Sequence, residues 1–437
     1  MTNPRPSFEK EELAFSSTPY VYLPVNIPAF TVELSHREAI DGELLQRALD
    51  RTIRRMPYLS DTLVSDHGAV YYAKNPLPME AAHFAGVRPI GGSETNYHLL
   101  DLTWDGSKTW FSMYHGFCDG QGISTFLESV LYHYYCMKDN TVYEANGIRE
   151  DSTQMSAAET FDPCSVSYEV SPDFTMPETK PQAAPYHLPE AKRSDDGTVL
   201  EYGLRVPSGD LMRVVKANGT SPSILLSLLV SEAIRRVHPE ADAPIQVNIP
   251  VSIRRQLGCE ETFKNCSSRA VLPVGGTPMD ALPFAERAAR LRALLKQQIS
   301  PDLFRSIYNK LGPMYRGRMQ QAASFQEELK KPDSFSNCCH DTFYIDYIGS
   351  LHKTGYSEQI TDVRFLCEPA AGKTVHLNVI EHNGVFRIAC LSGADASALA
   401  AAIEQVMREH ELPVQSLPAQ SFQLVHTVWR ESQEQGA

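Results

Sequence analysis

A histidine, an aspartate and a glycine stand close together at His115, Asp119 and Gly120, within the segment His-Gly-Phe-Cys-Asp-Gly. Neutral imidazole can accept a proton near neutral pH because its ordinary pKa is about 6.5. The aspartate can bind the local backbone, and the glycine permits conformations that side chains disfavour. Such a unit suits a reaction in which a base removes a proton from a hydroxyl or an amine.

The flanking residues predict a strand that ends at His115 and a helix that follows it. Asp105-Gly106 is a strong signal for a two-residue turn, which predicts a hairpin of strands over 97–104 and 107–114. A helix is expected from near Gly122, with one apolar stripe that we interpret as core. The stripe comprises Ile123, Phe126, Leu127, Val130, Leu131 and Tyr134.

With its flanks, the segment resembles the His-x-x-x-Asp-Gly motif of the chloramphenicol-acetyltransferase-like acyltransferases. That superfamily includes peptide-synthetase condensation domains and bacterial alcohol acetyltransferase-like proteins. The resemblance covers most of the chain in the order of its elements and is most specific at His115–Gly120. It implies an α/β (α+β) fold of two lobes, each a mixed sheet with flanking helices, and an active-site tunnel between the lobes.

The resemblance also implies roles for individual residues. His115 would be the general base, and Asp119 would form a structural salt bridge to Arg254, with Gly120 supporting the turn. A structural histidine and an ordinary exposed arginine are the alternatives. Tyr114 stands where many condensation domains have a first histidine, which makes a peptide-bond-forming activity less expected.

Further candidates for the tunnel or the oxyanion site come from two later stretches. Residues 262–268 resemble the Phe-Gly-Asn segment of the family, with Lys264 in place of the glycine, and a surface loop is the alternative. Residues 345–350 resemble a late Ser/Asn-x-x-Gly stretch, with Asp346 where a serine or asparagine is usual. The candidates are Tyr114, Asn265, Ser267, Tyr347 and Ser350.

The function that this resemblance implies is transfer of an acyl group from a thioester to a hydroxyl or amine of a small molecule. The thioester would be acyl-coenzyme A or a phosphopantetheine carried by an acyl carrier protein, used as co-substrate, with no bound cofactor. Two alternatives stay open: a standalone condensation-like enzyme acting on carrier-bound substrates, and a non-catalytic binding protein with the same fold.

The length of 437 residues favours two lobes, which we place at 1–175 and 176–437. A helix is expected over 42–55, where Asp41 can serve as N-cap and Leu45, Ala48, Leu49 and Ile53 fall on one face. A proline-rich linker is expected over 138–197. In the second half, strands are expected near 199–206, 245–251, 342–348, 363–367, 374–381 and 385–391, and helices from Ser221-Pro222 and over 281–299, 302–329 and 395–409.

Composition and charge exclude several other classes of protein. The net charge is −13 and no run of Lys and Arg is longer than a pair, which is unlike a nucleic-acid-binding protein. No apolar stretch approaches ~18 residues and no signal peptide is evident, so we expect a cytoplasmic protein without a membrane span. The nine cysteines are expected to be reduced.

No metal site is expected from the sequence. Cys338-Cys339-His340-Asp341 lacks a second cluster at zinc spacing. His376 and His382 would lie about 20 Å apart along an extended strand, too far to share an ion.

Overall fold

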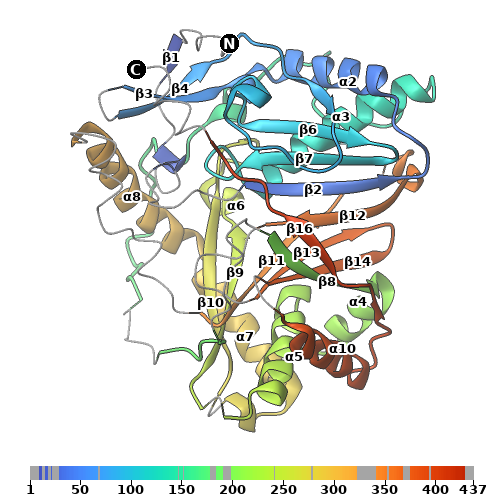
Figure 1. Ribbon diagram of the computed structural model, residues 1–437. Helices are drawn as coiled ribbons and strands as arrows, with labels where there is room; N and C mark the ends of the chain where they lie inside the picture. Colours follow the sequence, from blue (N-terminus) through green and yellow to red (C-terminus); the bar gives the residue numbers. More distant parts are fainter. Residues whose placement is uncertain are drawn as a thin grey trace.

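The computed structural model describes most of the chain. The described residues are 9–11, 15–17, 21, 29–66, 69–145, 147–150, 152–177, 184–189, 198–240, 242–276, 279–321, 341–351, 354–367, 375–392 and 395–428. Two large sheets, each with helices packed against it, lie one above the other in Figure 1. The mixed α/β fold class with two lobes, predicted from the sequence, is therefore confirmed, whereas the tunnel stays a prediction.

The first sheet has five strands in the order β12-β2-β7-β6-β5. They are β2 (Ala29–His36), β5 (Ala81–His83), β6 (Leu100–Asp105), β7 (Lys108–Tyr114) and β12 (Ile360–Leu366). β6 and β7 form the hairpin predicted around Asp105-Gly106. β12 comes from late in the chain yet pairs with β2, so both halves of the chain contribute to this sheet. The division at residues 175 and 176 remains a prediction.

Two helices, α2 (Gly42–Arg55) and α3 (Gly120–Lys138), lie side by side against the first sheet (Figure 1). The Asp41 carboxylate accepts from the backbone N–H groups of Glu43 and Leu44, which would otherwise lack partners at the start of α2. Leu45 and Leu49 are fully buried on the face predicted to be apolar. The first core therefore lies between these helices and the sheet that carries His115.

The second sheet has eight strands in the order β10-β9-β11-β13-β14-β8-β15, with β16 also paired to β8. They are β8 (Thr198–Pro207), β9 (Ile245–Ser252), β10 (Ser267–Gly275), β11 (Phe343–Ser350), β13 (His376–His382), β14 (Val385–Ser392), β15 (Gln415–Ser416) and β16 (Gln420–Gln423). β11 runs parallel to β9 and β13, and the other pairs are antiparallel.

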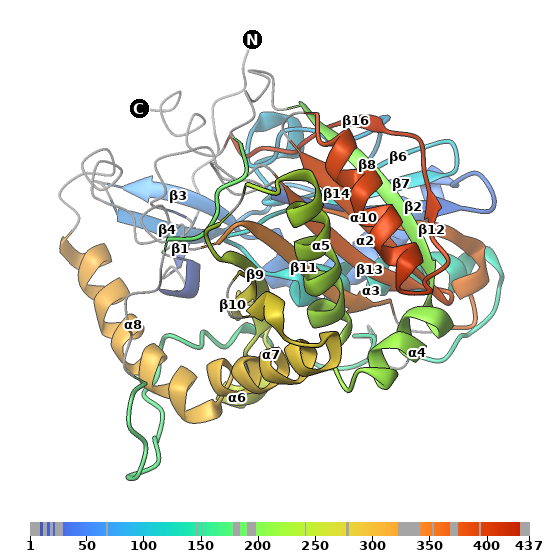
Figure 2. The ribbon, with the colours of Figure 1, turned by 90° about the horizontal axis from the view of Figure 1, so that it is seen from below.

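Helices cover one face of the second sheet, as the view from below shows (Figure 2). They are α4 (Ser208–Ala217), α5 (Pro222–Val237), α7 (Phe284–Gln298) and α10 (Ser397–Glu409). Ser221 caps α5 by accepting from the N–H of Ile224, and Pro222 takes the first helical position, as the sequence predicted. These helices and the sheet enclose a second core.

Alternation along β11 divides its side chains between the two faces of the second sheet. Phe343 and Ile345 belong to the core beneath the helices, whereas Ile348 packs against the core of the first sheet. Asp346, two residues before Ile348, therefore lies on the face turned toward the first sheet. The polar side chain thus points toward the lobe that carries His115.

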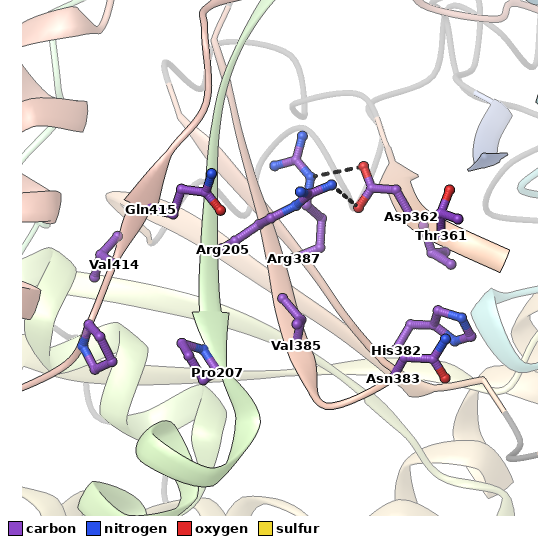
Figure 3. Close-up of a pocket in the computed structure, with 12 residues that line it drawn as sticks. Arg205, Pro207, Thr361, Asp362, His382, Asn383, Val385, Arg387, Val414 and Gln415 are labelled. Carbon is purple, nitrogen blue, oxygen red and sulfur yellow. Dashed lines mark ion pairs between the residues drawn. The ribbon is translucent and has the colours of Figure 1, made fainter. Parts of the chain in front are cut away.

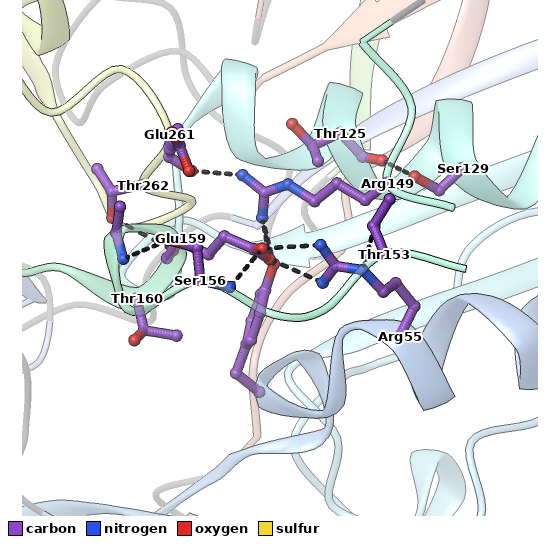
Figure 4. A network of polar contacts seen from close by, with 12 residues as sticks. Arg55, Thr125, Ser129, Arg149, Thr153, Ser156, Glu159, Thr160, Glu261 and Thr262 are labelled. Atoms are coloured by element: carbon purple, nitrogen blue, oxygen red, sulfur yellow. Dashed lines mark hydrogen bonds and ion pairs between the residues drawn. The ribbon is translucent and has the colours of Figure 1, made fainter. Parts of the chain in front are cut away.

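Two buried polar clusters connect distant parts of the chain. Arg364 of β12 pairs with Glu33 of β2 and with Glu201 of β8, and so links the two large sheets. Figure 4 shows the second cluster, in which the Glu159 carboxylate accepts from Arg55 of α2 and from Arg149. This cluster holds the segment after α3 against the first lobe.

The remaining elements are a small third sheet, two further helices and several 3-10 segments. β1 (Glu9–Glu11), β3 (Thr62–Asp66) and β4 (Ala69–Lys74) form a third sheet, and α6 (Arg254–Leu257) and α8 (Pro301–Gln321) are the other helices. The 3-10 segments are η1 (Phe15–Ser17), η2 (Pro57–Ser60), η3 (Ser93–Thr95), η4 (Ala157–Thr160), η5 (Met279–Ala281) and η7 (Ser357–Gln359). The predicted extension of α8 to residue 329 lies outside the described residues.

Candidate active site

His115 begins the short turn that joins β7 to α3. Asp119 is the N-cap of α3, and its carboxylate accepts from the backbone N–H groups of Gln121 and Gly122 at 3.2 Å each. Gly120 lies so close to β11 that a Cβ there would be 2.9 Å from a methyl group of Ile348. The hydrogen bonds of Asp119 therefore fix the backbone of the turn, and Gly120 lets the turn pack closely against the second sheet.

Asp119 also forms a buried, two-pronged ion pair with Arg254 of α6. The two terminal nitrogens of the guanidinium group, Nη1 and Nη2, each lie 2.7 Å from one carboxylate oxygen of Asp119. The backbone N–H of Cys266 donates to the same carboxylate at 2.9 Å. Burial alone would raise the pKa of Asp119, but the Arg254 charge and these hydrogen bonds hold it below its usual range. Asp119 is therefore an ionised anchor.

The other N–H groups of Arg254 reach the loop between α6 and β10. They donate to the carbonyl oxygens of Thr262 at 3.0 Å and Lys264 at 2.9 Å. Arg254 thus fixes this loop relative to Asp119. The next residue of the loop, Asn265, is buried beside His115.

His115 itself is partly exposed and is positioned on two sides. The Asn265 side-chain amide nitrogen donates to the His115 carbonyl oxygen at 2.9 Å and lies 3.3 Å from Nδ1 of the His115 ring. The Phe30 ring packs edge to face against the His115 ring, with 5.1 Å between the ring centres. Burial lowers the pKa of His115, and hydrogen bonds to nearby carbonyl groups and the Asp119 charge offset this only in part. The ring is therefore neutral at pH 7 and can accept a proton.

The second sheet supplies ionisable groups near this turn. Burial, followed by the negative charge of Asp119, raises the pKa of Asp346 to about 7. Burial lowers the pKa of His376 to about 3, and the nearby His115 contributes to the lowering. Asp346 therefore lies close enough to Asp119, and His376 close enough to His115, for charge on the turn to affect their pKa values.

The structure brings only some of the predicted candidates to His115. Asn265 contacts it, and Ser267 lies two residues further on, where its N–H donates to the Asn265 side chain at 3.0 Å. Tyr114 is fully buried in the first core. Tyr347 packs against the second core on the opposite face of β11, and no contact among the described residues joins the exposed Ser350 to His115.

Lys264 is directed away from solvent into an aromatic cluster. Its ammonium lies 4.2 Å from the ring centre of Tyr72 and 4.6 Å from that of Phe263. This contact accounts for a lysine that is only 7% exposed.

Sequence reasoning did not predict that Asp346 lies near Asp119 or that His376 lies near His115. The alternation of apolar and polar residues in Tyr344–Ile348 could have indicated that Asp346 shares a face with Ile348. The pairing of β11 with β13, which brings Asn378 beside Asp346, carries no such local signal.

A separate cavity of about 460 Å³ lies between β8, β12 and β14 (Figure 3). Arg205 and Asp362 form an ion pair of 2.9 Å at its edge, and Arg387 lies 3.9 Å from the same carboxylate. Since these charges are paired with one another and His115 is absent from its lining, this cavity is not part of the candidate active site.

Within the described parts of the chain, no three His, Cys, Asp or Glu side chains gather in a way that could hold a metal ion. Cys338, Cys339 and His340 lie outside the described residues. His382 instead contacts the carbonyl oxygen of Ile360 at 3.1 Å. Among the described helices, none is both long and apolar enough to cross a membrane.

Comparisons with known proteins rest on structure, since no family model and no curated protein matches this sequence. Polyketide synthase associated protein 5 from Mycobacterium tuberculosis superposes with a TM-score of 0.59 at 14% identity, covering 91% of this chain and 98% of that one. TRI101 from F. sporotrichioides, complexed with coenzyme A and T-2, gives 0.58 at 12% identity, covering 93% and 99%.

The first condensation domain of the CDA synthetase gives a TM-score of 0.52 at 13% identity, covering 93% of this chain and 96% of the domain. The chain therefore has the fold of the chloramphenicol-acetyltransferase-like, coenzyme A-dependent acyltransferases. The resemblance drawn from the His115–Gly120 segment is confirmed at the level of the fold.

Proposed function

We propose that this chain is an acyltransferase that moves an acyl group from a coenzyme A thioester to a hydroxyl or amine of a small molecule, with His115 as the base. The observation that carries the proposal is the turn from His115 to Asp119. Its aspartate is locked by Arg254, while its histidine is partly exposed and neutral.

The reaction needs only one proton carrier. His115 takes the proton from the acceptor O–H or N–H as the heteroatom attacks the thioester carbonyl. The carbonyl oxygen gains negative charge in the tetrahedral intermediate. The carbon–sulfur bond then breaks, and the departing thiolate receives the proton from His115, which restores the neutral ring.

Coenzyme A is the favoured donor because a neighbour in fold, TRI101, is described in complex with coenzyme A and T-2. Condensation domains share the fold, so a carrier-protein thioester is the second donor to test. Asp119, Gly120 and Arg254 act in this proposal as supports of the turn.

The test is release of free thiol from acetyl- and longer acyl-coenzyme A in the presence of pooled alcohols and amines. We expect acceptor-dependent release with the wild type and about 10²- to 10⁴-fold less with His115→Ala. His426→Ala is the matched control, because His426 is exposed and distant in sequence from the turn. Equal rates for wild type and His115→Ala would overturn the proposal.

If neither protein releases thiol from coenzyme A esters, an acylated carrier protein is the next donor to use. Transfer from that donor would show a condensation-like enzyme, and its absence would favour a non-catalytic binding protein.

A further inference from the structure

Asp346 and Asn378 form a pair of hydrogen-bond acceptors for which the described residues supply no donor. The two residues are directly paired in the parallel strands β11 and β13, so their side chains lie next to each other on the same face. Among the described residues, no hydrogen bond or ion pair reaches the Asp346 carboxyl group, which is partly exposed.

The orientation of the Asn378 amide is set by its neighbour. Its nitrogen donates to the carbonyl oxygen of Cys367 at 3.2 Å, and a carbonyl can only accept, so the amide oxygen must face away from Cys367. That oxygen is buried and has no partner within the described parts of the chain. A buried acceptor of this kind is costly unless a donor reaches it.

This acceptor pair faces the candidate active site. Ile348, on the same face of β11 as Asp346, approaches Gly120 of the His115 turn. Asp119 at the end of that turn is close enough for its charge to act on Asp346. The pair is thus on the side of the second sheet where a substrate of His115 would lie.

We propose that Asp346 and Asn378 form a subsite that binds a protonated primary amine of the acyl acceptor. An ammonium group supplies donors to both oxygens, and its positive charge compensates a carboxylate that lies near the negative charge of Asp119. This inference rests on the proposed acyl transfer and narrows its substrate class. The acceptor is an amino alcohol or a diamine, held by one nitrogen while its second heteroatom meets His115.

Binding of two matched probes tests the subsite without any thioester. 4-Aminobutan-1-ol and pentan-1-ol have the same four-carbon alcohol, which ends in an amine in the first and in a methyl group in the second. Calorimetry at pH 8 can compare their affinities for the protein. We expect the amine to bind roughly ten- to hundredfold more tightly, as for a hydrogen bond to a charged group. Asp346→Asn should bring the two affinities within about twofold of each other.

Thermal unfolding of Asp346→Asn distinguishes a binding role from a structural one. Because the carboxyl group would lose no hydrogen bond to any described residue, the variant should unfold at the wild-type temperature or above it. A lower unfolding temperature, with the amine preference unchanged, would overturn the inference. If the variant does not fold, Asn378→Asp, which adds a second carboxylate, should strengthen amine binding, and an unchanged preference would also overturn it.

The outcomes separate this inference from the proposed function. His115→Ala should retain the preference for the amine. Thiol release without any amine preference would remove the subsite and leave the acyltransferase. An amine preference without transfer from any thioester would support the subsite and remove the acyltransferase.

Discussion

Asp119 and Arg254, which are 135 positions apart in the chain, form a buried ion pair with two contacts of 2.7 Å. The aspartate caps the helix that follows His115, and the arginine holds the loop that carries Asn265. One ion pair therefore fixes two neighbours of the imidazole at once.

Breaking this pair should cost stability as well as activity. We expect Asp119→Asn to lower the free energy of unfolding by about 3–5 kcal/mol, because it leaves the Arg254 charge buried without compensation. Urea denaturation measures the change. Glu286→Gln is the control, since it removes an exposed pair with Arg290 and should cost at most about 0.5 kcal/mol. Similar losses in both variants would contradict the account.

Asn265 is predicted to position His115, and its replacement should affect turnover more than folding. Asn265→Ala removes the donor to the His115 carbonyl oxygen and should lower kcat by about ten- to hundredfold through misplacement of the ring. Steady-state kinetics should show KM nearly unchanged. Asn265→Gln, which can still donate, should recover part of the rate, and an unaltered kcat in Asn265→Ala would exclude the role.

The pH dependence of transfer should reflect the lowered pKa of His115. A base must be neutral to act, so kcat/KM should fall only when the pH drops below the ordinary histidine value of about 6.5. The rate profile between pH 4.5 and 8 measures this, with circular dichroism to verify that the protein stays folded. An acidic limb centred above pH 6.5 would be inconsistent with a lowered pKa of the His115 imidazole.

Glu159 should contribute to stability in a way that disappears in acid. Burial opposes ionisation, but hydrogen bonds from Arg55 and its other partners lower the pKa of Glu159 to about 2. A carboxylate whose folded pKa is depressed stabilises the fold above its unfolded pKa, about 4.3, and this contribution is lost as the pH falls toward 2. The difference in unfolding free energy between wild type and Glu159→Gln should therefore be largest above pH 5 and shrink between pH 4.5 and 2.

Local signals predicted α2, the hairpin that leads to His115 and the helix after it. The Asp41 cap and the leucine spacing gave α2 its bounds, and Asp105-Gly106 located the hairpin that leads to His115. The helix after the motif begins at Gly120, two residues earlier than expected, because Asp119 rather than a later residue is the N-cap. These elements depend on contacts between residues near in sequence.

Elements that depend on distant partners were harder to predict. β2 was not predicted, and it is a central strand between β7 and β12. Residues Ser267–Gly275 form β10, although a surface loop was the alternative for their start. The face shared by Asp346 and Asn378 exists only because β11 pairs with β13, which no local pattern encodes.

The central claim is that His115 carries the proton of the acceptor during acyl transfer. The most direct measurement is mass spectrometry of pooled amino alcohols, diamines and simple alcohols after incubation with coenzyme A esters that carry a ¹³C-labelled acyl group. The account predicts a labelled, acylated acceptor with the wild type and with His426→Ala, formed about 10²- to 10⁴-fold more slowly with His115→Ala. Labelled product formed by His115→Ala at the wild-type rate would contradict it.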